Sequence, residues 1–316
     1  MARFIPRNMS SVQQVKYDAI VGADLHIRED TPVARTDDYL SAQFGKMAFI
    51  QKLCKDNNNA PFLCGGDLLH NWKPSPWLLS KCLEFLPAMT IVVPGQHDLA
   101  QHSLVELPKT GLQTLAQAGR AAILTNGFER VLDGRIAVSG YAYGETATNK
   151  LRDQQGWLVL LWHHLTCFGK QPWPGAEAAE ATRMLSINLP GYDLIITGDN
   201  HQQFTFRFKD RWLVNPGSMM RMSADQIDFE PAVYGWRAND NSVTRIPLPI
   251  KKGVVSREHL GKEKSESRDK RMEAYIKRAQ KSYEAKLSFI ENLKVHIKKN
   301  RIGKEVEGLI WKAVGE

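Results

Sequence analysis

Short apolar runs alternate with segments of helical periodicity along the first 200 residues of the chain. Runs of β-forming residues that stop at Gly, Pro or polar residues are typical of buried strands, whereas apolar spacings of three and four residues are typical of helices. The predicted strands cover residues 17–23, 61–64, 89–93, 157–162 and 193–197, and the predicted helices cover 38–53, 77–85, 104–118 and 178–185. This alternation favours an α/β domain with two stacked sheets and helices outside.

Short strands become more frequent after residue 120. β segments are predicted at 121–124, 128–132 and 135–139. Phe204, Phe206 and Phe208 alternate with polar residues, which indicates a strand that pairs through Asp210-Arg211 with residues 212–214. We interpret the Asn-Pro-Gly-Ser stretch at 215–218 as the turn that closes this hairpin.

Five of the predicted strands end on side chains of the kind that bind metal ions. They are Asp24 and His26, Asp67 after two glycines, Gln96 with His97 and Asp98, His163 and His164, and Asp199 with His201. Ligand sites of open α/β sheets form outside the carboxyl ends of the strands. One such residue is more often a structural partner than a ligand, but its recurrence at five strand ends favours a metal centre. Carboxylate, imidazole and amide oxygen together suit two divalent ions such as manganese, iron or zinc.

Several residues near these strand ends keep two interpretations. Consecutive strand residues face opposite ways, so we expect only one of His163 and His164 to be a ligand and favour His163, the first residue after the apolar run. His164 would then contact substrate or pack against Trp162. His70 and His102 are interpreted as supporting or surface residues. Arg28 and Arg35 are candidates for phosphate contacts or, equally, for surface salt bridges.

Composition places the chain among globular proteins. Its 316 residues, 43% of them hydrophobic, suffice for one large or two ordinary domains. The first residues lack an apolar stretch of signal-peptide length and no uncharged run is long enough to span a bilayer, so we expect a cytoplasmic location and no membrane partner. The four cysteines form no CxxC pair and are expected to be free thiols.

The net charge of +8 arises entirely from the C-terminal fifth of the chain. Residues 251–316 contain 18 Lys and Arg and 10 Asp and Glu, which leaves 24 of each class for residues 1–250. We therefore predict two parts, a domain at 1–250 and a basic tail at 251–316 that meets a polyanion or an acidic partner. A solvated Lys-rich helix face without a partner is the alternative.

The tail has a helical pattern of its own. Residues 261–269 are charged and are interpreted as a linker, and apolar residues spaced by three and four then predict a long amphipathic helix over 272–297. Residues 300–303 break this pattern, and Val306, Leu309, Ile310 and Ala313 indicate a shorter second helix. We expect a module that docks a partner, DNA or a second copy of the chain, or one that caps the core of the first domain.

The order of these motifs resembles the calcineurin-like metallophosphoesterase superfamily: Asp-x-His, Gly-Asp, a variant of Gly-Asn-His-Asp, a strand-end His and a variant of Gly-His-x-His. More narrowly, residues 65–70 followed by Lys73-Pro74-Ser75, and residues 214–218, resemble the SbcD branch, the nuclease subunit of bacterial and phage DNA-break processing complexes. The resemblance covers residues 16–250. It implies a four-layer α/β/β/α sandwich with a C-terminal helical extension that docks an SbcC-like coiled-coil ATPase.

The resemblance also implies two divalent metal ions, Mn²⁺ with Mg²⁺ as the alternative. Carried over position by position, Asp24, His26 and His201 hold the first metal, Asp67 bridges, and Gln96, His163 and Asp199 complete the second. Gln96 stands where Asn is usual and Asp199 where His is usual. Because both departures fall on the second metal, we expect its affinity or metal preference to be altered rather than the site to be lost.

Two such ions would lower the pKa of a bridging water and hold a hydroxide for in-line attack on phosphorus. His97 would stabilise the transition state or protonate the leaving oxygen, with Asp98 orienting its ring. The predicted function is a metal-dependent DNA exonuclease and endonuclease, a hydrolase of phosphodiester bonds. The alternatives are a stand-alone phosphodiesterase or phosphatase on a small or protein substrate, and a DNA-end-binding scaffold with little turnover.

Overall fold

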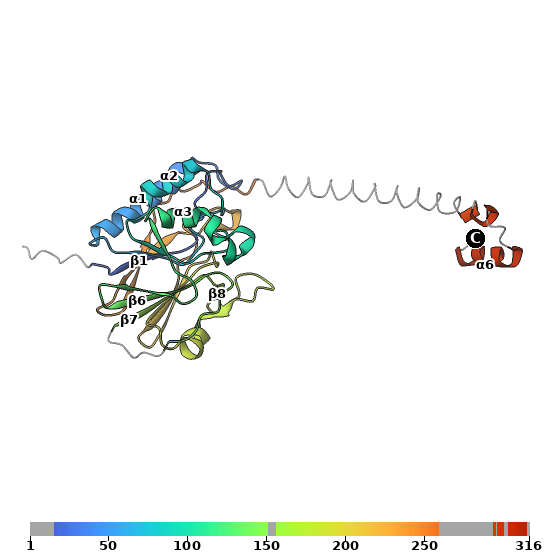
Figure 1. Ribbon diagram of the computed structural model, residues 1–316. Coiled ribbons are helices and arrows are strands. Elements are labelled where there is room, and N and C mark those ends of the chain that lie inside the picture. Colours follow the sequence, from blue (N-terminus) through green and yellow to red (C-terminus); the bar gives the residue numbers. More distant parts are fainter. Residues whose placement is uncertain (1–15, 151–155, 259–292, 295, 300–302, 315–316) are drawn as a thin grey trace, which may run out of the picture. The chain divides into compact units, whose positions relative to one another are not determined.

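The computed structural model describes residues 16–150, 156–258, 293–294, 296–299 and 303–314 (Figure 1). The chain divides into two compact units, Met1–Ser256 and Arg257–Glu316. Residues 251–256 still belong to the first unit, where Arg35 forms a β-bridge with Val255. No helix in these described ranges is both long and apolar enough to cross a membrane.

The first sheet is built around parallel strands that the sequence predicts. Its strands are β1 (Ala19–Gly22), β2 (Phe62–Cys64), β3 (Thr90–Val92), β4 (Ala121–Ile123), β13 (Ala232–Arg237) and β14 (Ser242–Pro247), in the order β14-β13-β1-β2-β3-β4. β1 to β4 run parallel, and β13 joins β1 antiparallel. The pattern analysis missed β13 and β14.

The second sheet has the same size and a similar plan. It contains β5 (Glu129–Leu132), β6 (Ile136–Tyr141), β7 (Trp157–Trp162), β10 (Leu194–Thr197), β11 (Phe204–Phe208) and β12 (Arg211–Asn215), in the order β11-β12-β10-β7-β6-β5. β6, β7, β10 and β12 are parallel, and the edge strands β5 and β11 are antiparallel. A small sheet pairs β8 (Thr166–Cys167) with β9 (Ala179–Glu180).

Strand residues alternate between two apolar environments, which produces the layers. In β2, Phe62 and Cys64 pack on the helix side, whereas Leu63 packs between the two sheets. The helices α1 (Tyr39–Asp56), α2 (Pro76–Phe85) and α3 (Gly111–Gln117) cover the first sheet (Figure 1). The short α4 (Ala181–Arg183) and the π-helix η3 (Met184–Asn188) cover the second. The predicted four-layer α/β/β/α sandwich is confirmed.

Local signals explain where the longer helices begin. The side chain of Asp38 accepts a hydrogen bond from the Ser41 amide at the start of α1, and Ser75 caps α2 in the same way ahead of a proline. The predicted helix 104–118 is instead two elements, η2 (Leu104–Lys109) and α3. Pro108 offers no N–H inside η2, and Thr110 caps α3 as a new helix.

Two further predictions are corrected. The predicted helix 178–185 begins only at α4, because Ala179 and Glu180 pair with β8 as a strand. Residues 215–218 do not close the β11–β12 hairpin. Phe208 pairs with Arg211, so the turn lies at residues 209–210, and Lys209 takes the left-handed conformation there with φ 55°.

In the second unit, α6 (Lys304–Val314) matches the predicted shorter helix. Its residues Val306 and Leu309 are exposed, whereas Ile297 of the same unit is buried. The predicted linker 261–269 and most of the predicted helix 272–297 lie outside the described residues.

The layer between the sheets should dominate the stability of the first unit. We expect Leu63→Ala to lower the free energy of unfolding by about 2–5 kcal/mol, since Leu63 is fully buried and a cavity would remain. The measurement is urea unfolding followed by circular dichroism. Val131→Ala, at a side chain that is 61% exposed, should cost less than about 1 kcal/mol. Equal losses in the two variants would contradict this assignment of the core.

Candidate metal centre

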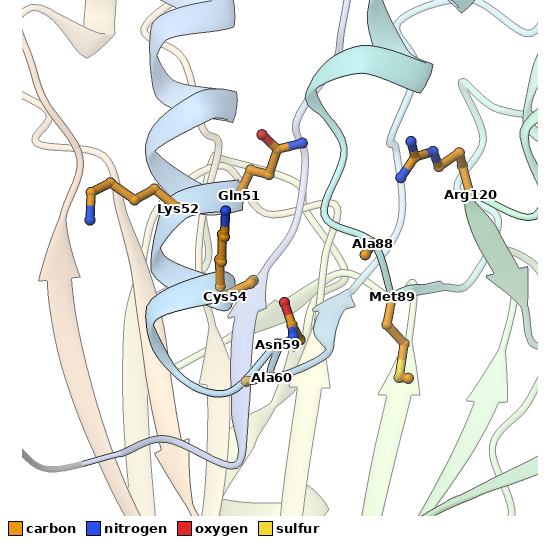
Figure 2. Close-up of a pocket in the computed structure, with 9 residues that line it drawn as sticks. Gln51, Lys52, Cys54, Asn59, Ala60, Ala88, Met89 and Arg120 are labelled. Atoms are coloured by element: carbon orange, nitrogen blue, oxygen red, sulfur yellow. The ribbon is translucent and has the colours of Figure 1, made fainter.

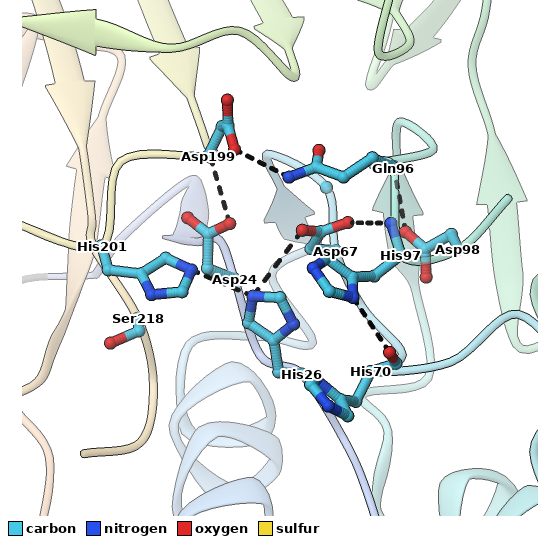
Figure 3. Close-up of polar contacts among 12 residues, drawn as sticks. Asp24, His26, Asp67, His70, Gln96, His97, Asp98, Asp199, His201 and Ser218 are labelled. Carbon is cyan, nitrogen blue, oxygen red and sulfur yellow. Dashed lines mark hydrogen bonds and ion pairs between the residues drawn. The ribbon is translucent and has the colours of Figure 1, made fainter. Parts of the chain in front are cut away.

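The carboxyl ends of five strands meet at one edge of the sandwich. β1, β2 and β3 end together in the first sheet, and β7 and β10 end together in the second. Two backbone hydrogen bonds join the first two loops, from the Asp24 amide to the Gly66 carbonyl and from the His26 amide to the Asp67 carbonyl, both 3.0 Å long. Figure 3 shows the side chains that follow these strands pointing toward one another.

The backbone at these strand ends is left-handed. Asp24, His26, Asp67 and Asp199 have φ values of 49°, 44°, 49° and 75°. Asp and His adopt this region more readily than most residues, but a non-glycine residue there still costs of order 1 kcal/mol or more. Four such residues at one edge indicate that the fold maintains strain in order to direct these side chains inward.

Two glycines allow the loops to approach each other. A Cβ on Gly66, whose φ is 108°, would lie 2.1 Å from Nδ1 of His163. A Cβ on Gly95 would lie 2.1 Å from Oδ1 of Asp67. The Gly residues of Gly-Gly-Asp and Gly-Gln-His-Asp are therefore required by the close packing of the loops at this edge.

The structure brings the predicted ligands of the first metal together. Nε2 of His26 lies 3.1 Å from Nε2 of His201 and 3.6 Å from Oδ2 of Asp67. On the other side of Asp67, the same oxygen lies 3.7 Å from Nε2 of His163. Two groups of ligand atoms each lie within 4.8 Å of one another, Asp24 with His26 and His201, and Asp24 with Asp67 and His163.

The chemistry of these atoms fits divalent cations. Oδ2 of Asp24 and Oδ2 of Asp67 are buried and have no hydrogen-bond partner among the described residues. Burial raises the pKa of Asp24 to about 7 and raises that of Asp67 well above its usual range, and burial lowers the pKa of His26. Buried carboxylates without partners beside neutral imidazoles lack positive charge, which a divalent ion would supply.

The predicted second site forms a continuous chain of close polar contacts. Nδ1 of His163 lies 2.7 Å from the Gly65 carbonyl, and its Nε2 lies 2.7 Å from the side-chain oxygen of Gln96. The Gln96 amide nitrogen in turn donates to Oδ1 of Asp199 at 2.7 Å. If His163 donates through Nδ1, its Nε2 and the Gln96 oxygen are two acceptors in contact, an arrangement that favours a nearby cation.

The two departures from the family pattern, Gln96 and Asp199, are therefore direct partners of each other. The Asp199 amide also donates to Oδ1 of Asp24 at 3.1 Å, which ties the loop after β10 to the loop after β1. The structure thus positions all seven predicted ligand residues at one centre. Their roles as ligands remain predictions.

The two neighbouring histidines take different places. His163 is buried and faces Asp67, whereas the ring of His164 stacks on Trp162 with centroids 4.0 Å apart and planes 4° apart. The alternating directions of consecutive residues at the strand end produce this separation. His164 therefore packs against Trp162, which is one of the two roles that the sequence allowed for it.

The surroundings of His97 correct one prediction. Nδ1 of His97 lies 3.0 Å from the carbonyl oxygen of His70, which orients the ring. The carboxylate of Asp98 instead accepts hydrogen bonds from the amides of Leu68, Leu69 and Gly95. Asp98 therefore holds the two loops together rather than orienting His97. Burial raises the pKa of Asp98 to about 6 and lowers that of His97.

His70 lies closer to the centre than the sequence indicates. Its ring stacks on His97 with centroids 5.2 Å apart and meets His26 edge to face at 5.5 Å. Burial lowers its pKa to about 4. The sequence did contain a hint of this position. His70 follows Asp67 by only three residues, so both side chains belong to the same loop.

Arg28 and Arg35 form intramolecular ion pairs. Arg35 is buried and pairs with Asp37 at 2.7 Å, which removes it from the surface where a phosphate would approach. Arg28 pairs with Asp30 and lines, with His70 and other residues, a pocket of about 330 Å³ beside the centre. Both arginines therefore form salt bridges in the structure, the second of the two roles that the sequence allowed.

The pattern analysis missed the buried residues that support the loops. The Met219 amide donates to the Asp24 carbonyl at 3.1 Å, and the ammonium of the buried Lys46 donates to the Met219 carbonyl at 2.8 Å. Burial lowers the pKa of Lys46 to about 7. The side chain of Gln43 holds the backbone of Arg28 through both its amide oxygen and its nitrogen. The sequence analysis missed Lys46 and Gln43 because polar residues on a helix usually lie on its exposed face.

Solved structures of other proteins align with most of this chain. A putative 5'-nucleotidase from Staphylococcus aureus, solved with alpha-ketoglutarate, has a similar fold at 15% identity and a TM-score of 0.50, over 79% of this chain and 57% of that protein. An archaeal phosphodiesterase aligns at 13% identity over 73% of this chain and 99% of its own, with a TM-score of 0.40. The protein TT1561 of Thermus thermophilus aligns at 11% identity over 75% of this chain and 100% of its own, with a TM-score of 0.45.

At 15% identity and a TM-score of 0.50, the S. aureus structure shows a likeness of fold alone, and this chain spans just over half of that protein. No curated protein matches the sequence. The family model named calcineurin-like phosphoesterase matches residues 20–203, a range that begins in β1 and includes every residue of the candidate centre. The chain therefore belongs to the calcineurin-like phosphoesterase family.

Proposed function

We propose that this phosphoesterase is a metal-dependent DNA nuclease, the counterpart of an SbcD subunit, with manganese as its preferred ion and magnesium as the alternative. The observation that carries the proposal is the buried Asp67 carboxylate with a histidine Nε2 on either side, at 3.6 and 3.7 Å. A carboxylate in this position is suited to be shared by two ions. Two-ion centres favour the hydrolysis of phosphate esters.

The assignment to DNA is supported by the motifs at residues 65–75 and 214–218. In the structure the second motif shapes the loop that carries His201. The Asn215 side chain donates to the carbonyls of Asn200 and Gln202, each at 2.7 Å, and the Ser218 amide donates to the His201 carbonyl at 3.2 Å. The narrower resemblance thus falls on residues that serve the centre.

The chain's own residues divide the reaction between them. Asp24, His26 and His201 would hold one ion, Gln96, His163 and Asp199 the other, with Asp67 between them. Such ions, when bound, supply Lewis acidity and activate water. Because the His70 carbonyl occupies Nδ1 of His97, the Nε2 atom is the ring nitrogen left for substrate. The neutral ring accepts a hydrogen bond at Nε2, because its proton is held at Nδ1 by the His70 carbonyl. His97 would donate a proton to the leaving oxygen from Nε2 only as the imidazolium.

Features of the tail favour an interaction with a partner protein. α6 exposes Val306 (52%) and Leu309 (68%) on a basic segment, a combination suited to docking another protein's helices. We propose that residues 257–316 dock a coiled-coil ATPase of the SbcC type, which would supply any dependence on ATP. The alternative is that the same segment binds a second copy of the chain. The deletion described below distinguishes the two, because only in this alternative would the deletion change the oligomeric state of the protein.

The central test is cleavage of end-labelled linear duplex DNA with Mn²⁺. We expect shortening of the DNA by the wild type and a loss of about a hundredfold or more for Asp67→Asn, because the amide removes the negative charge between the two histidines. Asp210→Asn, an exposed carboxylate in the β11–β12 turn, is the matched control and should retain activity. Hydrolysis of bis(p-nitrophenyl) phosphate without cleavage of DNA would contradict the DNA assignment for the chain alone.

The altered second site should change the choice of metal. We expect the wild type to be activated by Mn²⁺ or Mg²⁺ in preference to Zn²⁺, and Asp199→His to shift this preference toward Zn²⁺, because imidazole is the softer ligand. Hydrolysis of the small diester in metal titrations measures it. Asp210→His, in the β11–β12 turn, controls for the added histidine. An unchanged order of metals in Asp199→His would refute the prediction.

Deletion of residues 257–316 tests the two-part arrangement. We expect weaker binding of DNA or of the ATPase partner, because the deletion removes the basic segment, and unchanged hydrolysis of the small diester, because the centre lies in the first unit. The measurements are DNA binding by fluorescence polarisation, diester turnover, and mass by light scattering. Parallel loss of binding and turnover would show that the two parts do not act separately.

A further inference from the structure

A second concave surface lies at the edge of the sandwich opposite the metal centre. One pocket of about 420 Å³ is lined by the end of α1 and by the residues just before β2, β3 and β4 (Figure 2). A neighbouring pocket of about 610 Å³ extends to the β5–β6 turn and shares Asn59, Ala60 and Met89 with the first. We call the two together the amino-edge groove. Strand β2, whose three residues span about 10 Å at about 3.3 Å each, lies between the groove and the loop that carries Asp67.

The groove is positively charged. Lys55 and Arg120 line the first pocket, and Arg130 and Arg135 line the second. Lys16 also lines the second pocket, where its ammonium donates to the Asp56 carbonyl. Within the described ranges, none of the other four cations forms an ion pair with a carboxylate. Unpaired cations that gather in a concavity focus the electrostatic potential and attract anions.

The acidic side chains of the groove do not cancel this charge. No Asp or Glu lines the first pocket. In the second pocket, the carboxylate of Asp18 accepts a hydrogen bond from the Ala238 amide at 2.7 Å, and Asp133 lies exposed in the turn. Lys52 also lines the first pocket but pairs with Asp56. The four unpaired cations therefore exceed the acidic groups around them.

The wall of the groove is preformed. The side chain of Asn57 accepts a hydrogen bond from the Tyr17 amide at 2.9 Å and donates one to the Leu53 carbonyl at 2.8 Å. Asn58 and Asn59 take left-handed conformations, with φ of 60° and 56°, and the Ala60 amide then closes the turn onto the Cys54 carbonyl. A fixed loop costs little conformational entropy when a ligand binds.

The groove also offers apolar contact. Met89 is 40% exposed and Val131 is 61% exposed, so both present hydrophobic surface between the cations. Figure 2 shows Gln51 and Arg120 on opposite sides of the first pocket, with Ala88 and Met89 between them. Charged side chains around an apolar floor suit a ligand that is anionic along its length and has flat apolar groups attached.

We propose that the amino-edge groove binds the phosphate backbone of a nucleic-acid strand, at a place separate from the metal centre. Unpaired cations in each of two adjoining pockets match successive phosphates of one strand, whereas a mononucleotide would engage only one pocket. The choice of nucleic acid over another polyanion rests on the proposed function. The site itself follows from the geometry and charge of the described residues and needs no turnover.

The test is binding of a fluorescein-labelled 12-nucleotide single strand to the full chain in EDTA, so that neither metal nor cleavage contributes. Lys55→Gln/Arg120→Gln should raise the Kd about tenfold at low salt and reduce the slope of log Kd against log [NaCl] by about 1.4, as for two lost phosphate contacts. Lys81→Gln/Lys109→Gln removes the same charge from residues that are paired with Glu84 and Glu106. Equal effects in the two double variants, or none in either, would overturn the proposal.

A second readout locates the strand within the full chain, where the basic tail also binds. Acetylation of Lys55, followed by mass spectrometry, should slow about fivefold or more when the 12-nucleotide strand is bound, while Lys109 reacts at an unchanged rate. Equal labelling of Lys55 with and without the strand would refute the site. AMP at the same phosphate concentration should not protect Lys55 from acetylation. Equal protection by AMP would overturn the proposal of a strand and identify the ligand as a mononucleotide. Because EDTA is present throughout, failure here is distinct from failure of the nuclease assay.

Discussion

Buried negative charge without a protein partner is the constraint on which this structure depends. Asp24 and Asp67 are fully buried, and each leaves one carboxylate oxygen without a hydrogen bond among the described residues. Burying such a group costs several kcal/mol, and the left-handed backbone at both residues adds to that cost. The apolar layers of the sandwich must offset these terms. Ions that bind the folded chain but not the unfolded chain would stabilise the folded state and offset part of this cost. Folding and metal binding are therefore thermodynamically linked.

The centre also depends on the contact between the two sheets. The ligand candidates before residue 100 follow strands of the first sheet, whereas His163, Asp199 and His201 follow strands of the second. The hydrogen bonds from His163 to the Gly65 carbonyl and from the Asp199 amide to Asp24 both cross between the sheets. A shift of one sheet against the other would break them. The hydrophobic layer that separates the sheets therefore sets the distances within the centre, although none of its residues is a ligand candidate.

The strand ends were predictable from sequence because their signal is local: an apolar run, a break at glycine and then a ligand side chain. The pairing of Gln96 with Asp199 joins residues 103 positions apart, and no local pattern encodes it. For the same reason the three backbone partners of Asp98 could not be deduced, and its adjacency to His97 led to a wrong orientation. β13 was missed because Gly235, packed against the Tyr17 ring, interrupts its apolar pattern.

The balanced charge of residues 1–250 conceals a separation of charge between the two edges of the sandwich. Asp24, Asp67 and Asp98 lie buried at the metal edge, whereas unpaired Lys and Arg residues line the opposite edge. Because burial raises the pKa of Asp24 and Asp67, the metal edge without cations offers a phosphate backbone no positive charge, and bound divalent ions would supply it. The proposed binding of a polyanion at that edge is therefore expected to depend on metal, while the proposed binding at the amino-edge groove and the basic tail is expected to depend on monovalent salt alone. The two dependences make the sites separable in one protein.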